Sequence, residues 1–134
     1  MKQQFTIKGR LASLNDYILA CRTSPWKGNK FKHEQQEKVN NAIQESCLYR
    51  VDANALPIKA IFVFYEKNAK RDLDNISGWA HKAVMDALVN NGILENDGWK
   101  QIAGYTDHFY IDKENPRVEI YLESLQQEES EPKQ

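Results

Sequence analysis

Two aspartates spaced two residues apart, Asp72 and Asp74, are the residues of this chain best suited to chemistry. They lie in the segment Lys70-Arg71-Asp72-Leu73-Asp74-Asn75, between a strongly apolar run and a long amphipathic pattern. Carboxylates that converge at a strand-to-helix junction suit Mg²⁺ or Mn²⁺, because these ions prefer oxygen ligands and leave positions for water and phosphate. Taken alone, the pair is explained at least as well by helix capping, since Asp is a preferred N-cap residue.

A third carboxylate, Asp97, follows the amphipathic pattern in the segment Glu95-Asn96-Asp97-Gly98-Trp99. Asn-Asp-Gly is also a good turn sequence, so a purely structural role for Asp97 stays open. A helix of about 17 residues before it would span about 25 Å and carry the chain away from Asp72. Asp97 can therefore join the pair only if the following strand returns to it or if a second subunit supplies the geometry.

Other common kinds of site find no support in the sequence. An EF-hand loop starting at Asp72 needs Gly at its sixth position and Glu at its twelfth, where the chain has Ser77 and Ala83. The three histidines are scattered without metal-site spacing, which favours structural or surface roles. No nucleophilic triad motif, phosphate-binding glycine loop or dinucleotide fingerprint is present, so we expect no organic cofactor.

The hydropathy pattern predicts a single α+β domain with a mixed β-sheet covered by two α-helices, in the order β-α-β-α-β-β. Apolar alternation and short apolar runs predict strands at 3–8, 57–65, 100–110 and 116–123. Apolar side chains at three- and four-residue spacing predict helices at 33–48 and 74–91, after a helical turn at 13–20. The nearly continuous apolar run at 57–65 predicts a central strand buried on both faces.

Length and composition limit the class of protein. The chain has 134 residues, which suits one domain, and we expect residues 1–125 to form it and the polar segment 126–134 to be disordered. No apolar run approaches the roughly 18 residues that a membrane span needs, so no membrane partner is expected. The two cysteines, Cys21 and Cys47, are too few for a disulfide framework, which predicts reduced thiols and a cytoplasmic location.

The formal net charge of −1 hides an asymmetry between the two parts of the chain. Residues 1–50 carry nine Lys and Arg against four Asp and Glu, and residues 51–134 carry nine against fifteen. The segment 21–32 has no acid and is predicted to be a long basic loop, of a length that is usually functional or mobile.

Several segments follow one another in a known pattern. They are Asp72-Leu73-Asp74-Asn75-Ile76, then Lys82 with Asp86-Ala87-Leu88, then Gly92-Ile93-Leu94-Glu95-Asn96-Asp97. This series resembles the RusA family of Holliday junction resolvases. The family pattern is a DxDN motif, a helix with Lys and Asp-Ala-Leu, and a closing acidic group. The segment Gly9-Arg10-Leu11-Ala12-Ser13-Leu14-Asn15-Asp16-Tyr17 resembles the opening of its phage and prophage branch, so the resemblance covers about residues 5–122.

The resemblance implies a Mg²⁺-dependent homodimeric endodeoxyribonuclease that cuts four-way DNA junctions symmetrically, in recombination and repair in a bacterial host cell. Mn²⁺ is expected to substitute for Mg²⁺. The family's essential aspartates carry over to Asp72, Asp74 and Asp97, while Asn96 stands where members commonly have a further Asp. The family lysine corresponds to Lys82, which lies two helical turns beyond Asp74 instead of one, and an ion pair with Asp86 is its alternative role.

These inferences combine into one hypothesis. Three aspartates hold one or two Mg²⁺ ions, and Lys82 or Lys70 neutralises phosphate charge. Contacts to backbone phosphates are expected from Arg22, Lys27, Lys30, Lys32, Lys70 and Arg71. Trp26 or Phe31 of the basic loop is expected to stack at the junction centre, and the alternative is a solvated loop with a core aromatic residue. Two other classes of protein stay open. One is a metal-dependent nuclease with a different nucleic-acid substrate. The other is a non-catalytic protein that binds branched DNA, in which the aspartates only cap helices and form turns.

Overall fold

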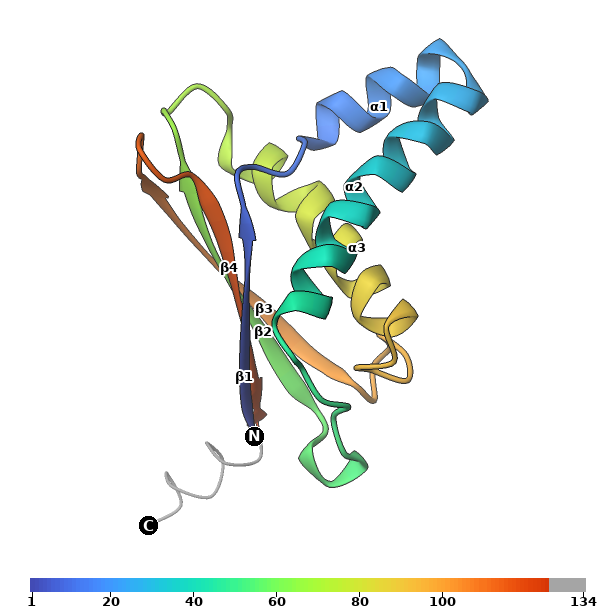
Figure 1. Cartoon of the computed structure of the whole chain (residues 1–134), viewed down its shortest axis with the longest axis vertical. Coiled ribbons are helices and arrows are strands. Elements are labelled where there is room, and N and C mark those ends of the chain that lie inside the picture. The colour runs from blue at the N-terminus through green and yellow to red at the C-terminus, as the bar shows by residue number, and fades with distance from the viewer. Residues whose placement is uncertain (126–134) are drawn as a thin grey trace.

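The computed structural model describes residues 1–125 and contains one sheet and three α-helices in that part of the chain (Figure 1). The elements are β1 (Lys2–Lys8), α1 (Leu14–Thr23), α2 (Pro25–Glu45), a short 3₁₀ helix η1 (Ala53–Ala55), β2 (Ile58–Glu66), α3 (Leu73–Asn90), β3 (Ile102–Ile111) and β4 (Arg117–Ser124). The strands lie in the order β1-β4-β2-β3. β4 is antiparallel to both of its neighbours, whereas β2 and β3 are parallel, so the sheet is mixed as predicted.

The hydrophobic core lies between one face of the sheet and the helices (Figure 1). Every second side chain of β2 is buried, and the alternate side chains are half-buried. β2 lies between β4 and β3, so its predicted central position is confirmed. The prediction that it is buried on both faces is wrong, because the helices cover only one face of the sheet.

An aromatic cluster joins the three helices above this core. Trp79 of α3 is fully buried, with its ring centroid 4.4 Å from that of Tyr17 in α1 and 6.0 Å from that of Phe31 in α2. Truncating a buried ring of this size typically costs about 3–5 kcal/mol of stability. The cluster therefore fixes the position of α1 and α2 on α3.

The predicted basic loop at 21–32 is wrong, because these residues belong to a helical hairpin formed by α1 and α2. Ser24 caps α2 by accepting a hydrogen bond from the Lys27 N–H at 3.0 Å, and Pro25 occupies the first helical position, where no N–H is needed. The two helices approach closely at Gly28, where a Cβ atom would lie 2.9 Å from the Cys21 Sγ. Local capping and a close helix contact thus order a segment that composition alone suggested was irregular.

The rest of the predicted fold is confirmed, with small changes of boundary. The order β-α-β-α-β-β holds if the hairpin is counted as one helical unit, although three α-helices rather than two are present in residues 1–125. The predicted turn at 13–20 is a full helix that starts with a capping box between Ser13 and Asp16. The predicted tail at 126–134 lies outside the described residues. None of the described helices is long and apolar enough to cross a membrane.

Candidate metal centre and nucleic-acid interface

Asp72 occupies the N-cap position of α3 but does not use its side chain as a cap. Its backbone is extended (φ −70°, ψ 147°), and its carbonyl accepts hydrogen bonds from the N–H groups of Asn75 and Ile76, both at 3.1 Å. Its carboxylate makes no capping hydrogen bond and lies on the surface. The interpretation that Asp72 is only a helix cap therefore loses its main physical basis.

Asp74 lies in the first turn of α3 and is also exposed. Both residues lie at the N-terminus of α3, where the helix dipole has its positive end. Carboxylate oxygens with open solvent positions are what Mg²⁺ or Mn²⁺ needs, and the donor set fits such an ion.

Asp97 lies beyond the opposite end of α3. The helix has 18 residues and is therefore about 27 Å long, and the loop after it lies at the far end from the turn that precedes it (Figure 1). β3 begins near this loop and runs parallel to β2, so Asp97 is not carried back to the pair. Within residues 1–125 no group of three or more His, Cys, Asp or Glu side chains could hold a metal ion. One subunit thus places Asp72 and Asp74 at the N-terminus of α3 and Asp97 beyond its C-terminus.

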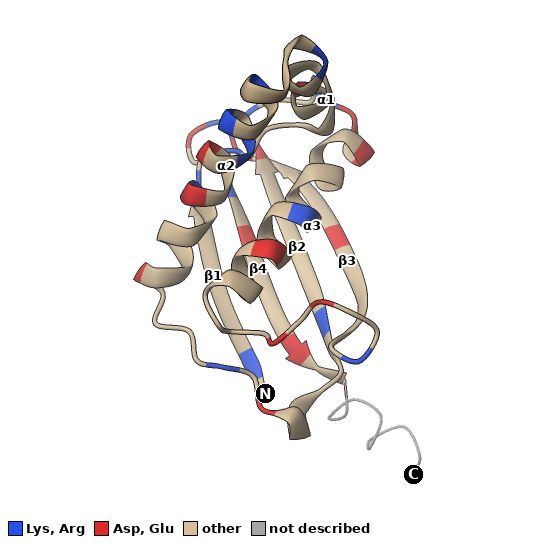
Figure 2. Cartoon of the chain, turned by 90° about the vertical axis from the view of Figure 1, so that its right-hand side faces the viewer, with Lys and Arg blue, Asp and Glu red and all other residues tan. Residues whose placement is uncertain are grey.

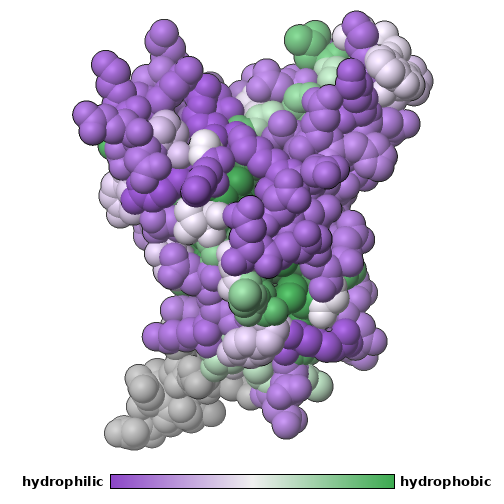
Figure 3. All heavy atoms as spheres, in the orientation of Figure 1, coloured by the Kyte–Doolittle hydropathy of each residue, from purple (hydrophilic) through white to green (hydrophobic). Residues whose placement is uncertain are grey.

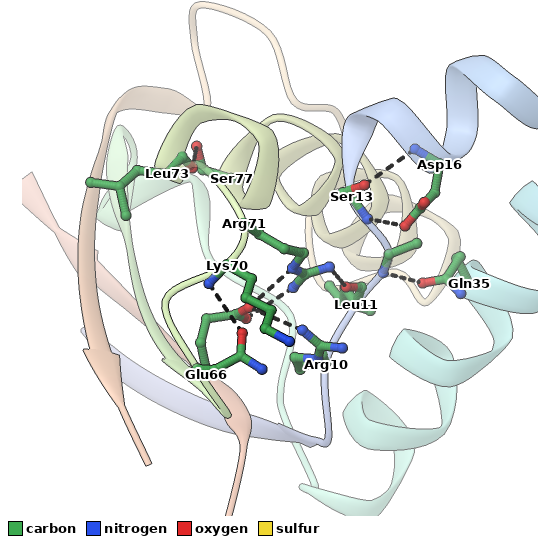
Figure 4. A network of polar contacts seen from close by, with 12 residues as sticks. Arg10, Leu11, Ser13, Asp16, Gln35, Glu66, Lys70, Arg71, Leu73 and Ser77 are labelled. Carbon is green, nitrogen blue, oxygen red and sulfur yellow. Dashed lines mark hydrogen bonds and ion pairs between the residues drawn. The ribbon is translucent and has the colours of Figure 1, made fainter. Parts of the chain in front are cut away.

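A buried ion pair anchors the turn that carries the aspartates (Figure 4). Glu66, the last residue of β2, binds Arg71 through two contacts, from Nε to Oε1 at 3.0 Å and from Nη2 to Oε2 at 2.9 Å. Arg71 also donates from Nη1 to the carbonyl of Leu11 at 3.0 Å, and Arg10 lies 3.4 Å from Glu66. Arg71 was predicted to contact DNA; its guanidinium group is instead engaged inside the protein.

Asn75, the last residue of the DxDN motif, connects α3 to the hairpin. Its Oδ1 accepts a hydrogen bond of 2.9 Å from the N–H of Asn15, at the start of α1. One turn later, a Cβ atom on Gly78 would lie 3.2 Å from the Leu14 side chain, so the two helices touch there. The motif therefore contains a structural contact as well as two free carboxylates.

The two candidate phosphate-binding lysines occupy different surroundings. Lys82 lies two turns along α3 and pairs with Asp86, with the Nζ–Oδ2 distance 3.4 Å, which is the alternative role that its spacing suggested. Lys70 is exposed two residues before Asp72, at the entrance to α3. Of the two, Lys70 is closer along the chain to the aspartate pair.

The helical hairpin carries most of the predicted DNA-contacting cations (Figure 2). Arg22, Lys27 and Lys30 are exposed and Lys32 is half-buried. Trp26 is 67% exposed at the hairpin tip, with the Nζ atom of Lys30 5.3 Å from its ring centroid. Phe31 packs in the aromatic cluster, so Trp26 is the aromatic residue available for stacking.

A small hydrophobic area also marks the hairpin. It lies on the outer side of α1, within a hydrophilic surface, at the upper right of the molecule (Figure 3). Among the large apolar side chains of α1, Leu19 is the most exposed, at 66%. Cationic side chains beside exposed apolar ones are a combination found in proteins that bind distorted DNA.

Sequence reasoning missed the surroundings of Asp97. Trp99 is 98% exposed, and together with Asp97 and Tyr105 it lines a shallow hollow of about 350 Å³. Burial, assisted by the negative charge of Asp97, raises the pKa of the Tyr105 hydroxyl. Next to Tyr105, a hydrogen bond of 2.8 Å joins His81 Nε2 and Asp107 Oδ1 across α3 and β3. Only the tertiary packing of α3 on β3 brings these residues together, and no local spacing indicates it.

The chain was compared with known protein families. The family Endodeoxyribonuclease RusA matches residues 24–123, which is more than half of the chain. The matched range includes α2, the DxDN motif, all of α3 and the loop with Asp97. No curated protein matches the chain. The coverage of the family match is sufficient to conclude that the chain belongs to the RusA family of endodeoxyribonucleases.

Proposed function

We propose that this protein is a Mg²⁺-dependent homodimeric endonuclease that resolves four-way DNA junctions by paired phosphodiester hydrolysis, in recombination and repair in the cytoplasm of a bacterial cell. One observation carries the proposal: Asp72 and Asp74 expose carboxylates without capping hydrogen bonds at the strand-to-helix junction of a RusA-family chain. A capping role would have used the side chain of Asp72. A bound divalent cation would balance the negative charges of these two carboxylates.

The chemistry requires the residues to hold a cation beside a phosphate. A bound Mg²⁺ or Mn²⁺ ion supplies charge neutralisation and lowers the pKa of an attacking water molecule. Asp72 and Asp74 would hold the ion at the N-terminus of α3. Lys70 would offset the charge of the scissile phosphate, with Lys82 as the second candidate since its ammonium group is already paired with Asp86.

The third carboxylate points to a site shared between two subunits. Asp97 lies beyond the far end of an 18-residue helix from Asp72 and Asp74, so its own chain keeps it away from them. A symmetric dimer in which α3 and its copy run antiparallel brings the loop of one subunit to the turn of the other. We therefore propose that Asp97 of one subunit completes the metal site of its partner.

The proposed DNA surface is the helical hairpin. Arg22, Lys27, Lys30 and Lys32 would contact backbone phosphates, which position the DNA without reading its sequence. Trp26, exposed beside Lys30, would stack on a base at the distorted centre of the junction. The hydrogen bond between Asn15 and Asn75 ties this surface to the aspartate turn.

The function is tested by incubating the purified protein with a synthetic four-way junction, a linear duplex of the same sequence and a structured RNA, each with Mg²⁺ and with EDTA. We expect paired symmetric cuts in the junction with Mg²⁺, no cuts with EDTA, and little cleavage of the duplex. Faster cleavage of RNA or of the duplex would instead indicate a nuclease with another substrate. Junction binding without cleavage in Mg²⁺ or Mn²⁺ would indicate the non-catalytic alternative.

Removing four hairpin cations is expected to weaken junction binding by about a hundredfold at 100 mM salt and to flatten its dependence on salt. The substitutions are Arg22→Gln, Lys27→Gln, Lys30→Gln and Lys32→Gln, and binding is measured in EDTA across a salt series. Each lost phosphate contact reduces the slope of log K against log salt by about 0.9. The matched control replaces exposed lysines elsewhere, Lys2, Lys67, Lys100 and Lys113. Equal losses in both variants would show that the hairpin is not the DNA surface.

A further inference from the structure

Glu66 is a buried carboxylate that the proposed mechanism does not use. It is the last residue of β2 and only 3% exposed. A buried carboxylate is costly unless it is paired and hydrogen-bonded, and Glu66 meets this condition through Arg71 and Arg10. The two parallel contacts with Arg71 form a fork that fixes direction as well as distance.

The fork acts on the backbone that carries the candidate metal ligands. Arg71 directly precedes Asp72, so fixing its guanidinium group also fixes the start of α3. Arg71 is held on a second side by the carbonyl of Leu11, and Asn75 is held by Asn15. The residues on both sides of the Asp72–Asp74 segment are thus anchored, while its two carboxylates remain exposed.

We infer that Glu66 and Arg71 are positioning residues that hold Asp72 and Asp74 in the geometry that binds the metal ion. This inference rests on the proposed function. The pair is not needed merely to fill space, because well-packed apolar residues can replace a buried ion pair without loss of stability. Its particular contribution is a fixed orientation for the turn, and partners that orient metal ligands typically change metal affinity by 10–100-fold when mutated.

The test compares Arg71→Lys, which keeps the charge but loses the fork, with Arg117→Lys as a matched control. Arg117 also pairs with two carboxylates, those of Asp112 and Glu119, and its side chain is 21% exposed against 18% for Arg71. It lies on the sheet face that the helices leave open. Glu66→Gln is the second test variant, since it removes the charge from the other partner.

Two quantities are measured: Mn²⁺ binding to the protein without DNA, by electron paramagnetic resonance of the free ion, and the Mg²⁺ concentration for half-maximal junction cleavage. We expect Arg71→Lys and Glu66→Gln to weaken Mn²⁺ binding and to raise the Mg²⁺ requirement by about tenfold or more. Cleavage by Arg71→Lys at saturating Mg²⁺ should return to near the wild-type rate. Junction binding in EDTA should stay unchanged, and Arg117→Lys should behave as wild type in all assays.

The outcomes separate this inference from the proposed function. A wild-type protein that cleaves junctions with Mg²⁺, together with variants of unchanged metal dependence, overturns the positioning role and leaves the function standing. Arg71→Lys and Arg117→Lys variants that lose thermal stability and activity equally show a purely structural role, which also overturns it. A wild-type protein that binds no Mn²⁺ and cleaves nothing overturns the proposed function itself.

Discussion

Replacing Asp72 by Asn is expected to reduce Mg²⁺-dependent junction cleavage by about a thousandfold, equivalent to about 4 kcal/mol of transition-state stabilisation. Asn has nearly the same shape as Asp but no charge, so it cannot balance a divalent cation. Junction binding in EDTA should stay within about twofold of wild type, because phosphate contacts supply the affinity. The measurement pairs single-turnover cleavage of a labelled four-way junction with a binding titration of the same DNA.

Asp52 offers a matched control for this substitution. It is also an exposed N-cap aspartate, of η1, with extended backbone (φ −67°, ψ 149°) and no capping hydrogen bond from its side chain. Asp52→Asn changes the same chemical group in the same local setting, so we expect it to leave cleavage unchanged. If Asp72→Asn keeps more than a tenth of the wild-type rate, Asp72 does not hold the metal ion.

Local signals account for the parts of the fold that the sequence predicts well. The apolar stripe of α3 extends over several turns, and β2 is a nearly continuous apolar run, so both elements are found within one or two residues of the predicted bounds. The helical turn at 13–20 and the helix at 33–48 were predicted, but residues 21–32 between them were predicted as a loop because their apolar pattern is weak and their cations dominate the composition. The signals of the hairpin were Ser24 followed by Pro25 and the small residue Gly28, which lets α2 approach α1.

The candidate site also has a part that local sequence predicts and a part that it does not. The pair Asp72 and Asp74 could be found from the sequence because both the spacing and the strand-to-helix position are local. The Glu66–Arg71 fork joins residues only five apart, but its burial depends on Arg10 and Leu11, which lie about 55–60 positions earlier in the chain. No pattern along the chain shows that contact, since it exists only once β1 has paired in the sheet and the segment after it reaches the aspartate turn.

Mixing two inactive variants is expected to restore cleavage if the metal site is shared between subunits. One variant is Asp97→Asn, and the other combines Asp72→Asn with Asp74→Asn. A hybrid dimer then has one site with all three carboxylates intact and one site that lacks all three. With random exchange, half of the dimers are hybrids and each has one intact site, so we expect about a quarter of the wild-type number of active sites.

The products distinguish this outcome from simple contamination with wild-type protein. A hybrid with one working site should nick the junction on one strand and not release the paired products of full resolution. Two different affinity tags allow hybrids to be purified, so that their formation is shown separately from their activity. A mixture of Asp72→Asn with Asp74→Asn serves as the control, because every hybrid site then lacks a carboxylate whichever subunit supplies Asp97.

Purified hybrids that remain inactive would contradict the shared site. In that case Asp97 would either bind the metal ion of its own subunit or bind no metal ion. The length of α3 argues against the first of these alternatives. The helix is about 27 Å long, whereas carboxylates that share one metal ion with ligand distances of 2.0–2.1 Å must lie within a few ångströms of one another. Restored nicking would therefore show that dimer formation completes the metal site, which links the assembly of the protein directly to its chemistry.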